Sequence, residues 1–561
     1  MKTKSIKDAV HGYIKLDEPY WKIIDTPEFQ RLKWLEQTSY RVLYPSARHD
    51  RFIHSIGTYH LGVSAINGFS ENCKKLLGNN KIVEKYRESF LFACLLHDVG
   101  HSPFSHTCED LYNYRDKVSN IESIINQKLL TTVEKFLAKE EFEDFSKDYE
   151  YIINAHDNIC KAPSEHEIMS IIVIMDNFAN FSSGFPETIR HSLSKDLIIR
   201  SVIGCVYSVN HSLSQDVITD RGIKNCLIRL LNSSTVDVDK LDYIARDTMM
   251  SGYENIALDN ERLLSSVSFV VKDEIYYPAF NKSALSVINN VILAKNSQSK
   301  WIVNHPIVIY EFYLLRKSIG ISIKKMCEEF FDDNQNEHFD FVLSSIFSAD
   351  SLSTNVKKIC NFDFSLLSDI DIIFLMKQNI RNKDVSEYFE RNNRKHPIWK
   401  SHDEYLHCLG KESATNVADF FAPLINHFIG VEDLYHPKHI DIDFYNELKD
   451  KKTESITNRQ EIFNILEVLK KYCDKVNADF DFVILPASNK FSAKINSKQL
   501  FIRFSNEDSD FSTYEELQND AVVNQQVGYA FFYLYSKDKI NSKDFLGFVK
   551  ETINNESDFR C

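Results

Sequence analysis

Hydrophobic and polar positions follow a helical rhythm over most of the chain. The stretch "IIDTPEFQRLKWLEQ" places apolar residues at helical spacing, and it predicts a helix that Asp25 caps and Pro27 opens. Helical periodicity continues to about residue 330 and returns over residues 330–430. We therefore expect a body made largely of helices.

Three stretches depart from this rhythm. Residues 1–16 alternate polar and apolar side chains around a glycine, which predicts a short extended arm and a turn. Residues 267–279, "VSFVVKDEIYYPA", combine β-branched and aromatic residues around a turn, and residues 480–505 predict two or three further strands. Residues 514–538 and the C-terminus predict helices again.

These patterns predict a mainly α fold with a smaller α+β unit at the C-terminal end. We expect a helical core over residues 1–325, a helical extension over residues 326–430 and the α+β region over residues 431–561.

Composition narrows the class of protein. The chain has 561 residues, 43% of them hydrophobic and 26% charged, as in an ordinary globular protein. The net charge of −14 argues against an extended nucleic-acid groove. No apolar stretch approaches the roughly 20 residues that span a bilayer. The 11 cysteines form no C-x-x-C pair, and no secretory signal is apparent, so we expect reduced thiols and a cytoplasmic location without membrane contact.

Candidate chemistry gathers in two histidine-rich motifs. "RFIHSIG" places His54 in an apolar helix, and "SFLFACLLHDVGHSPFSH" ends a core helix with His97 and Asp98. Because a buried carboxylate is costly without a partner, a divalent cation held together with neutral imidazoles is the simplest explanation of this pair.

A third motif, "VDVDKLDYIARD", lies far downstream. Asp239, Tyr243 and Asp247 fall on one helical stripe, and Lys240 and Arg246 flank it. Carboxylates and a phenol in one stripe are unusual for a core. The stripe suits a pocket for a cation and a hydroxylated, phosphorylated ligand.

Each motif alone is weak evidence, because a single histidine in an apolar helix is more often a hydrogen-bonded core residue; we interpret His60 in that way. Together and in this order, the three motifs resemble the HD-domain superfamily of metal-dependent phosphohydrolases. Within it they are most similar to the deoxynucleoside triphosphate triphosphohydrolases, over roughly residues 4–310. The resemblance implies an HD-domain helical core.

The resemblance implies a metal held by two histidines and two aspartates. The matching residues are His54, His97, Asp98 and Asp239. Such ligands suit Mn, Fe, Zn or Co without deciding among them. The ion would acidify a water molecule and polarise the α-phosphate, and Mg²⁺ would accompany the nucleotide phosphates.

The resemblance also implies catalytic residues near the phosphates. The matching residues are His101, His106, His166 and Glu109. Histidines placed there donate a proton to the leaving oxygen or stabilise developing charge, and Glu109 would orient the general acid.

Substrate contacts follow in the same way. The cations that match phosphate ligands are Arg51, Lys240 and Lys295, and the residues that match sugar contacts are Tyr243, Asp247 and Gln37. Val303 stands where vertebrate members have a tyrosine that packs against the deoxyribose, so discrimination against ribonucleotides is left open.

Vertebrate members carry an activator nucleotide site at a subunit interface. The residues that match it are Lys4, Asp25, Gln30 and Lys33. Lys33 replaces an arginine, and lysine cannot stack or form a planar fork in the same way, so guanine recognition is expected to differ. A helix cap and solvated side chains are the alternative interpretation of these residues.

The resemblance therefore implies a metal-dependent enzyme that converts a dNTP and water into a deoxynucleoside and triphosphate. It also implies a homo-oligomer, either a tetramer or a hexamer. An activating nucleotide, and a role in nucleotide-pool control or antiphage defence, are further implications. Two alternatives stay open: another HD phosphohydrolase acting on a signalling nucleotide or single-stranded nucleic acid, and a nucleotide-gated regulator without catalysis.

Overall fold

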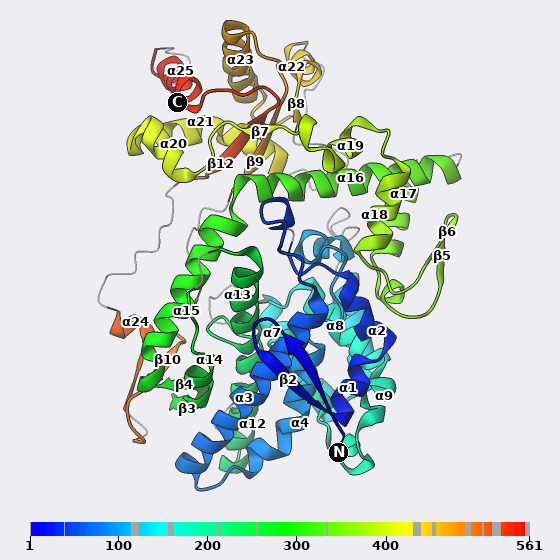
Figure 1. The fold of residues 1–561 in the computed structure, drawn as a ribbon, viewed down its shortest axis with the longest axis vertical. Coiled ribbons are helices and arrows are strands. Elements are labelled where there is room, and N and C mark those ends of the chain that lie inside the picture. The colour runs from blue at the N-terminus through cyan, green and yellow to red at the C-terminus, as the bar shows by residue number, and fades with distance from the viewer. Residues whose placement is uncertain are drawn as a thin grey trace. The chain divides into compact units, whose positions relative to one another are not determined.

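The fold was analysed in a computed structural model, which describes the chain apart from residues 1, 39, 114–122, 155–161, 210–212, 254–255, 332–334, 430–438, 451–455, 488–494, 508–509, 519–528 and 556–561. The chain is mainly α-helical with small β-sheets, as the periodicity predicts (Figure 1). It divides into two compact units. Unit 1 comprises residues 1–295, 327–372 and 494–523, and unit 2 comprises residues 296–326, 373–493 and 524–561.

Two long helices and a third from much later in the chain form the centre of unit 1. Helix α3 (Arg51–Leu77) packs against α4 (Lys81–Leu96), and α13 (Val238–Ser251) packs on α3. Further helices enclose them, namely α6 (Ile124–Glu134), α7 (Lys139–Asn154), α8 (Glu165–Asp176), α11 (Lys195–Ile203), α12 (Gln215–Leu231) and α14 (Asn260–Ser265).

The C-terminal half of helix α4 is apolar for a physical reason. Every residue from Ser89 to Leu96 is buried, because α3, α11 and α12 all pack against it. The following residues leave the helix at the edge of this core. Helical turns that are hydrophobic all round must lie inside the protein, which is why the polar pair after Leu96 is held in a buried position.

The N-terminal arm is a β-hairpin. Strands β1 (Thr3–Asp8) and β2 (Gly12–Asp17) pair antiparallel, and Gly12 adopts a φ of +75° at the turn. Helix α1 (Glu18–Ile24) follows, and the next helix, α2 (Pro27–Gln30), has Thr26 rather than Asp25 at its N-cap. The expected cap was therefore wrong by one residue: Asp25 ends α1, and a single turn of α2 passes into a 3-10 turn at Arg31–Trp34.

A four-stranded sheet in unit 1 joins distant parts of the chain. The predicted hairpin is confirmed as β3 (Val267–Lys272) and β4 (Ile275–Asn281). Strand β10 (Phe501–Arg503) adds to β4 in parallel, and β11 (Phe511–Thr513) pairs with β10. Part of the expected C-terminal region therefore belongs to the sheet of unit 1.

Unit 2 has its own sheet and core. Its four strands lie in the order β7 (His396–Pro397), β12 (Phe532–Ser536), β9 (Phe482–Pro486), β8 (His439–Ile440), and all pairs are antiparallel. The helices that supply its apolar core are α20 (His402–Leu409), α21 (Lys411–Ile429), α22 (Ile442–Lys449), α23 (Arg459–Val476) and α25 (Ser542–Asn555). The fully buried Trp399 donates its indole N–H to the carbonyl of Phe532 at 3.1 Å, within this core.

The helix expected over residues 514–538 was wrong. Only a short turn, α24 (Tyr514–Leu517), is helical there, Phe532–Ser536 is the strand β12, and residues 519–528 lie outside the described residues. All five residues of β12 are buried, because it is a central strand covered on both faces. Such a strand reads as a continuous apolar run and shows no alternation.

The remaining elements complete the chain. Their bounds are α9 (Phe178–Phe181), α10 (Glu187–Ser192), α15 (Leu285–Gln298), α16 (Pro306–Phe330), α17 (Gln335–Ile346), β5 (Lys357–Ile359), β6 (Phe362–Phe364), α18 (Asp369–Gln378) and α19 (Lys383–Phe389). Both compact units are assembled from separate segments. The expected division at residues 325 and 430 therefore stays a prediction about folding units.

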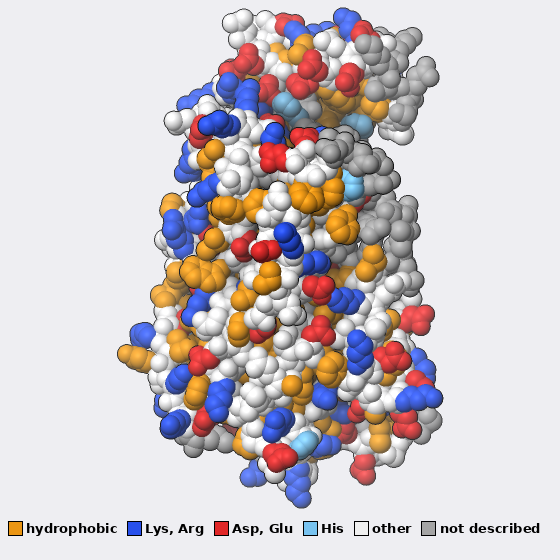
Figure 2. All heavy atoms as spheres, turned by 90° about the vertical axis from the view of Figure 1, so that its right-hand side faces the viewer, with side chains coloured by type: hydrophobic (Ala, Val, Ile, Leu, Met, Phe, Trp, Pro, Cys, Tyr) orange, Lys and Arg blue, Asp and Glu red, His pale blue; other side chains and the backbone are white. Residues whose placement is uncertain are grey.

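Two surface observations bear on partners. Within the described part of the chain, every helix is too short or too polar to cross a membrane. Figure 2 shows Lys, Arg, Asp and Glu side chains interspersed on the face drawn, without a continuous basic track. A nucleic-acid groove would need such a track.

Candidate metal centre and its surroundings

Three helices bring the predicted metal ligands together. His54 lies in the first turn of α3, where Asp50 caps the helix by accepting the backbone N–H of Ile53. Asp239 lies in the first turn of α13, which Asp237 caps in the same way. Helix α4 ends at Leu96, so the histidine and aspartate that follow it lie at its C-terminal end.

The four candidate ligands converge. Nε2 of His54 lies 3.0 Å from Oδ1 of Asp239 and 3.5 Å from Oδ2 of Asp98. Nε2 of His97 lies 3.4 Å from Asp98 and 3.6 Å from Asp239. Ligand atoms of His54, His97 and Asp98 lie within 4.8 Å of one another. The side chain of Asp239 is 34% exposed, so the cluster opens to solvent on the side of α13.

The ring nitrogens that face this cluster fit a cation. The Nε2 atoms of His54 and His97 are buried, and neither makes a well-aligned hydrogen bond within the described chain. A buried polar atom without a partner is costly. Imidazole nitrogens and carboxylate oxygens around one point are the donor set of a transition metal, so the residues present fit such an ion.

The electrostatics of the cluster also favour added positive charge. Burial alone would raise the pKa of Asp98, but Arg51 and the nearby imidazoles outweigh it and hold that pKa well below its usual range. Burial likewise opposes ionisation of Asp239, and His54 and His97 keep its pKa well below the usual range. Burial lowers the pKa of His54, and the surrounding carboxylates reverse this and raise it to about 10.

A further carboxylate, which we did not predict, supports the metal site from behind. Asp242 is fully buried, and its Oδ2 lies 2.7 Å from Nδ1 of His54. Its Oδ1 lies 2.6 Å from Nε2 of His11, in the N-terminal hairpin, and Arg246 donates to both oxygens. Because Asp242 accepts from Nδ1, Nε2 of His54 is the nitrogen that would give its lone pair to an ion in the cluster.

Two further contacts orient the other ligands. Nδ1 of His97 lies 3.0 Å from the carbonyl oxygen of Cys94, which directs its Nε2 into the cluster. Arg51 is buried and donates to Asp98 at 2.7 Å and to the hydroxyl of Ser105 at 2.9 Å. In this structure the guanidinium therefore holds a metal-ligand candidate, and its expected grip on phosphate stays a prediction.

The three predicted catalytic histidines form a second cluster beside the first. His101 is buried, and Nε2 of its ring lies 3.3 Å from Oδ1 of Asp98. The ring of His166 stacks on that of His101, with centroids 3.9 Å apart and an angle of 14° between the planes. His106 stands edge-on to both rings, at 5.1 and 5.2 Å. His166 belongs to the first turn of α8, and its side chain is only 12% exposed.

Glu109 joins two of these histidines. Its Oε2 lies 2.7 Å from Nδ1 of His166 and 3.0 Å from Nδ1 of His106. Burial lowers the pKa of His166, but Glu109 outweighs burial and raises it. Burial and the charge of Arg51 lower the pKa of His101 well below its usual range. The pair Glu109–His166 therefore favours a charged imidazolium, next to a neutral His101.

Two of the predicted substrate residues, Lys240 and Tyr243, lie on α13, and Lys295 lies on α15. Tyr243 receives a hydrogen bond from Lys295, which also lies 4.9 Å from its ring centroid. Lys240 binds Asp237 and donates to the carbonyl of Ser233 at 2.6 Å. These contacts leave the phosphate and sugar roles of the three predicted residues as predictions.

The other two sugar-contact candidates are also buried. Asp247 lies 2.7 Å from Nε2 of His49, and the backbone N–H of Gln37 donates to the carbonyl of the same histidine at 3.0 Å. The side-chain oxygen of Gln37 is buried without a hydrogen-bond partner among the described residues. His49 thus joins two candidates that the sequence separates by 210 positions, and it was not predicted.

The expected activator residues form two pairs on the N-terminal segment. Nζ of Lys4 lies 3.1 Å from Oδ2 of Asp25, with both side chains about half exposed, and 3.8 Å from the ring of Trp21. Lys33 donates to Gln30 at 2.6 Å, and Gln30 donates to the carbonyl of Ile24 at 2.7 Å. Nucleotide binding there stays a prediction.

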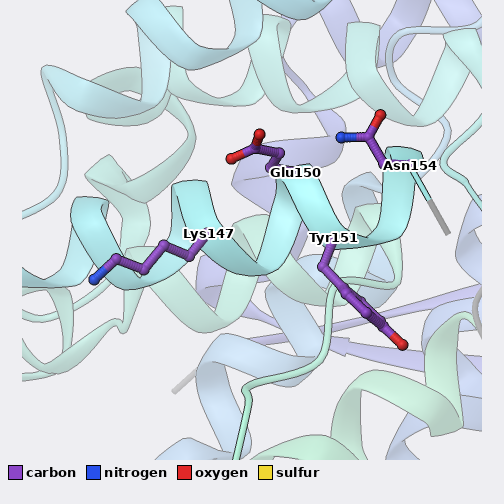
Figure 3. A pocket seen from close by; sticks show the side chains of 4 residues that line it. All are labelled: Lys147, Glu150, Tyr151 and Asn154. Carbon is purple, nitrogen blue, oxygen red and sulfur yellow. The ribbon is translucent and has the colours of Figure 1, made fainter.

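Hollows on the surface do not mark this chemistry. The open hollow of Figure 3 lies along α7 and is lined by Lys147, Glu150, Tyr151 and Asn154, all from that one helix. None of the candidate ligands or catalytic histidines lines it. This hollow is therefore distinct from the candidate metal centre.

Comparison with known proteins gives a local similarity. No protein-family model matches the chain. It is 22% identical to uncharacterized protein YwfO of Bacillus subtilis over 404 residues, covering 69% of this chain and 75% of that protein. It is 46% identical over 107 residues to uncharacterized protein MJ1154 of Methanocaldococcus jannaschii, 19% of this chain and 21% of that protein.

A similar local match involves an enzyme with a stated activity. The chain is 40% identical over 105 residues to human deoxynucleoside triphosphate triphosphohydrolase SAMHD1, 18% of this chain and 16% of that protein. The matched regions thus span about a fifth or less of this enzyme and of the archaeal protein. The chain also aligns with the crystal structure of a hypothetical protein from Aquifex aeolicus. The alignment covers 97% of this chain and all of that one, at 15% identity and a TM-score of 0.47.

Proposed function

We propose that this chain is a metal-dependent phosphohydrolase of the HD type, and that it hydrolyses a dNTP to a deoxynucleoside and triphosphate. The observation that carries the proposal is the convergence of His54, His97, Asp98 and Asp239, with two buried Nε2 atoms directed at one point. The local similarity to SAMHD1 supports the substrate class.

In this reaction a water oxygen forms a bond to the α-phosphorus while the bond from that phosphorus to the 5′-oxygen breaks. The leaving oxygen takes up one proton, and the attacking water loses one. A transition metal in the cluster would supply an acidified water and a polarised phosphoryl oxygen. The remaining tasks, which are holding the phosphates and moving protons, fall to the chain itself.

The second cluster provides a proton donor. His166 is held by Glu109, which raises its pKa and so keeps its ring charged to higher pH. We infer that His166 protonates the leaving 5′-oxygen. His101, which contacts Asp98 of the first cluster and stacks on His166, keeps that ring in place. Lys240 and Lys295 would bind the phosphates once they exchange their present partners for phosphate oxygens.

The test is a product analysis on the purified full chain. Each dNTP is incubated with the protein and with Mn²⁺, Co²⁺, Zn²⁺ or Fe²⁺, and nucleosides, nucleotides and triphosphate are separated by chromatography. We expect deoxynucleoside and intact triphosphate in equal amounts. Their absence with every dNTP and metal would exclude the proposed reaction.

The same incubations distinguish the nearest alternatives. Ribonucleotides test the consequence of Val303, and cyclic dinucleotides and a single-stranded oligonucleotide test the other phosphohydrolase classes. If the protein hydrolyses one of these compounds and no dNTP, the proposed substrate is wrong, and the proposal of a metal-dependent hydrolase still holds. An activating nucleotide would be recognised by faster dNTP turnover after a second nucleotide is added.

A further inference from the structure

Asp369 lies far along the chain from the predicted site, yet it contacts two segments of it. It is the first residue of α18 and is 4% exposed. Its Oδ1 accepts the backbone N–H of Phe104 at 2.6 Å, and its Oδ2 accepts the backbone N–H of Glu36 at 2.8 Å. Phe104 lies between His101 and His106, and Glu36 precedes Gln37.

A carboxylate in the first turn of a helix ordinarily caps that helix. In α18 a different residue does so: Asp371 accepts from the backbone N–H and the hydroxyl of Ser368, at 2.7 and 2.8 Å. Both oxygens of Asp369 are directed instead at backbone groups of other segments. Burial of a carboxylate is costly. The two bonds therefore indicate that Asp369 has a role other than helix capping.

The segment that Asp369 holds is under backbone strain. Phe104 and Ser105 have φ angles of +56° and +51°, in the left-handed region that residues other than glycine rarely adopt. Such a turn persists only where its surroundings hold it. Arg31 adds a second restraint nearby, since it donates to the carbonyl oxygens of Val99 and His101 at 2.8 and 2.9 Å.

The bonds of Asp369 continue toward the metal cluster. The hydroxyl of Ser105 donates to the carbonyl of Glu36 at 2.7 Å and accepts from Arg51 at 2.9 Å. Arg51 in turn donates to Asp98. Hydrogen bonds therefore connect Asp369 to Glu36 and to the strained turn. They continue from the turn through Arg51 to Asp98, a candidate metal ligand.

We propose that Asp369 is a positioning residue, which clamps the strained turn between His101 and His106 onto the segment that carries Gln37. The proposal rests on the proposed function, because it concerns the geometry of that site. Asp369 itself touches no substrate. Its loss would let the catalytic histidines move relative to the sugar-contact side, and a displacement near 1 Å lowers turnover about 100-fold in enzymes generally.

The first test needs no substitution and no substrate. The backbone N–H groups of Phe104 and Glu36 are bonded to Asp369 alone among the described residues. Hydrogen–deuterium exchange at single-residue resolution on the full chain is expected to show both groups protected at least about 100-fold over an unstructured peptide. Exchange of both at the unprotected rate would overturn the proposal, whether or not the protein hydrolyses a nucleotide.

The second test compares two isosteric substitutions in the same helical turn. In Asp369→Asn, one oxygen becomes an N–H₂ group that cannot accept, whereas Asp371→Asn changes only the cap of α18. We expect Asp369→Asn to speed exchange of residues 36 and 104 about 10-fold or more and to lower kcat about 10–100-fold, with KM changed less. Asp371→Asn is expected to leave both exchange rates unchanged.

The metal content of the variant distinguishes a positioning role of Asp369 from loss of the folded site. Asp369→Asn is expected to keep the bound metal of the unsubstituted protein, because none of the four candidate ligands contacts residue 369. Unchanged exchange and unchanged kcat in a folded Asp369→Asn protein would overturn the clamp. An unsubstituted protein that hydrolyses no nucleotide would overturn the proposed function, and the exchange data would still decide the clamp.

Discussion

Asp242 and His54 are joined by a buried contact of 2.7 Å between a carboxylate oxygen and Nδ1 of the imidazole. The contact selects the nitrogen of His54 that faces the candidate metal cluster. It also ties this ligand to the N-terminal hairpin, since the other oxygen of Asp242 lies 2.6 Å from His11. The candidate metal site therefore extends beyond its four candidate ligands.

Substitution of a supporting residue should weaken metal binding without removing a ligand. Asp242→Asn loses the anionic acceptor of His54, and we expect an affinity for Mn²⁺ or Co²⁺ lower by about 10–100-fold. Competition with a chelator measures it. Because Asp242 also pairs with Arg246, His11→Phe serves as the milder variant, and His11→Gln, which can still donate to Asp242, as its control. Equal affinity in all three would contradict the supporting role.

Removal of a ligand should have a larger effect. His97→Ala and Asp239→Ala each take one donor from the cluster, and we expect the purified proteins to contain less than about a tenth of the metal of the unsubstituted chain, with turnover lowered at least about 1,000-fold. Elemental analysis of the purified protein measures the first quantity. His60→Ala is the matched control, because His60 packs against His11 outside the cluster. Full metal content in either ligand variant would remove that residue from the site.

The close approach of α3 to α13 requires a glycine. A Cβ at Gly57 would lie 2.0 Å from Oδ1 of Asp242 and 2.5 Å from Nη2 of Arg246. We expect Gly57→Ala to destabilise the fold by about 1–3 kcal/mol and to disturb the support of His54. Gly547→Ala, in α25 with no atom within 4 Å of the added carbon, is the control, and it should be neutral or slightly stabilising. Chemical denaturation of both variants tests the difference.

The pH dependence of stability should carry the signature of Asp369. Burial raises its pKa to about 7, against the hydrogen bonds from Glu36 and Phe104, which lower it. In the unfolded chain this carboxyl ionises near its ordinary value of about 4. Between these values the folded state binds the extra proton, so this contribution to stability is complete below about pH 4 and is lost as the pH rises to about 7.

Asp369→Asn removes this term. The free energy of unfolding of the unsubstituted chain should fall by a few kcal/mol more than that of the variant between about pH 4 and pH 7, as urea denaturation at several pH values would show. Parallel curves for the two proteins would mean that residue 369 does not titrate in this range.

The proposed proton donor, His166, predicts how turnover depends on pH. His166 has a raised pKa because of Glu109, so its charged form is present below that pKa and is lost as the pH rises through it. Turnover that depends on this proton should decline on the alkaline side. Glu109→Gln removes the raising charge, and we expect the decline of kcat/KM to move to lower pH, whereas His166→Gln should lower kcat about 100–10,000-fold. An unmoved alkaline limb in Glu109→Gln would assign the proton to another group.

The local patterns in the sequence were sufficient for several elements. The apolar run before His97 predicts a buried helix that ends in polar residues, and the spacing of Asp239, Tyr243 and Asp247 predicts one stripe of a helix; both are confirmed. Both predictions need only local sequence, because helix periodicity depends on residues within a few positions of one another. The same holds for the hairpin at residues 267–281.

Local patterns failed where burial on two sides removes periodicity. Phe532–Ser536 reads as part of a helix, and only its neighbours in the sheet make it a strand. Asp25 reads as the N-cap of a helix, but α1 precedes it and Asp25 is the C-cap of α1, so the N-cap of α2 is Thr26. Signals for the missed residues did exist: Asp242 stands inside the quoted "VDVDKLDYIARD", and His11 in the N-terminal arm, but nothing local indicates that they meet.

The sequence by itself determined which residues are candidates for metal binding and acid–base chemistry, because side-chain type and spacing are written in it. Only the tertiary structure decided which of them share a site. His54 meets Asp242 across 188 positions, and Phe104 meets Asp369 across 265. Contacts between residues so far apart in the sequence depend on how whole helices pack and on the cost of burying each charge. No short stretch of sequence encodes either quantity.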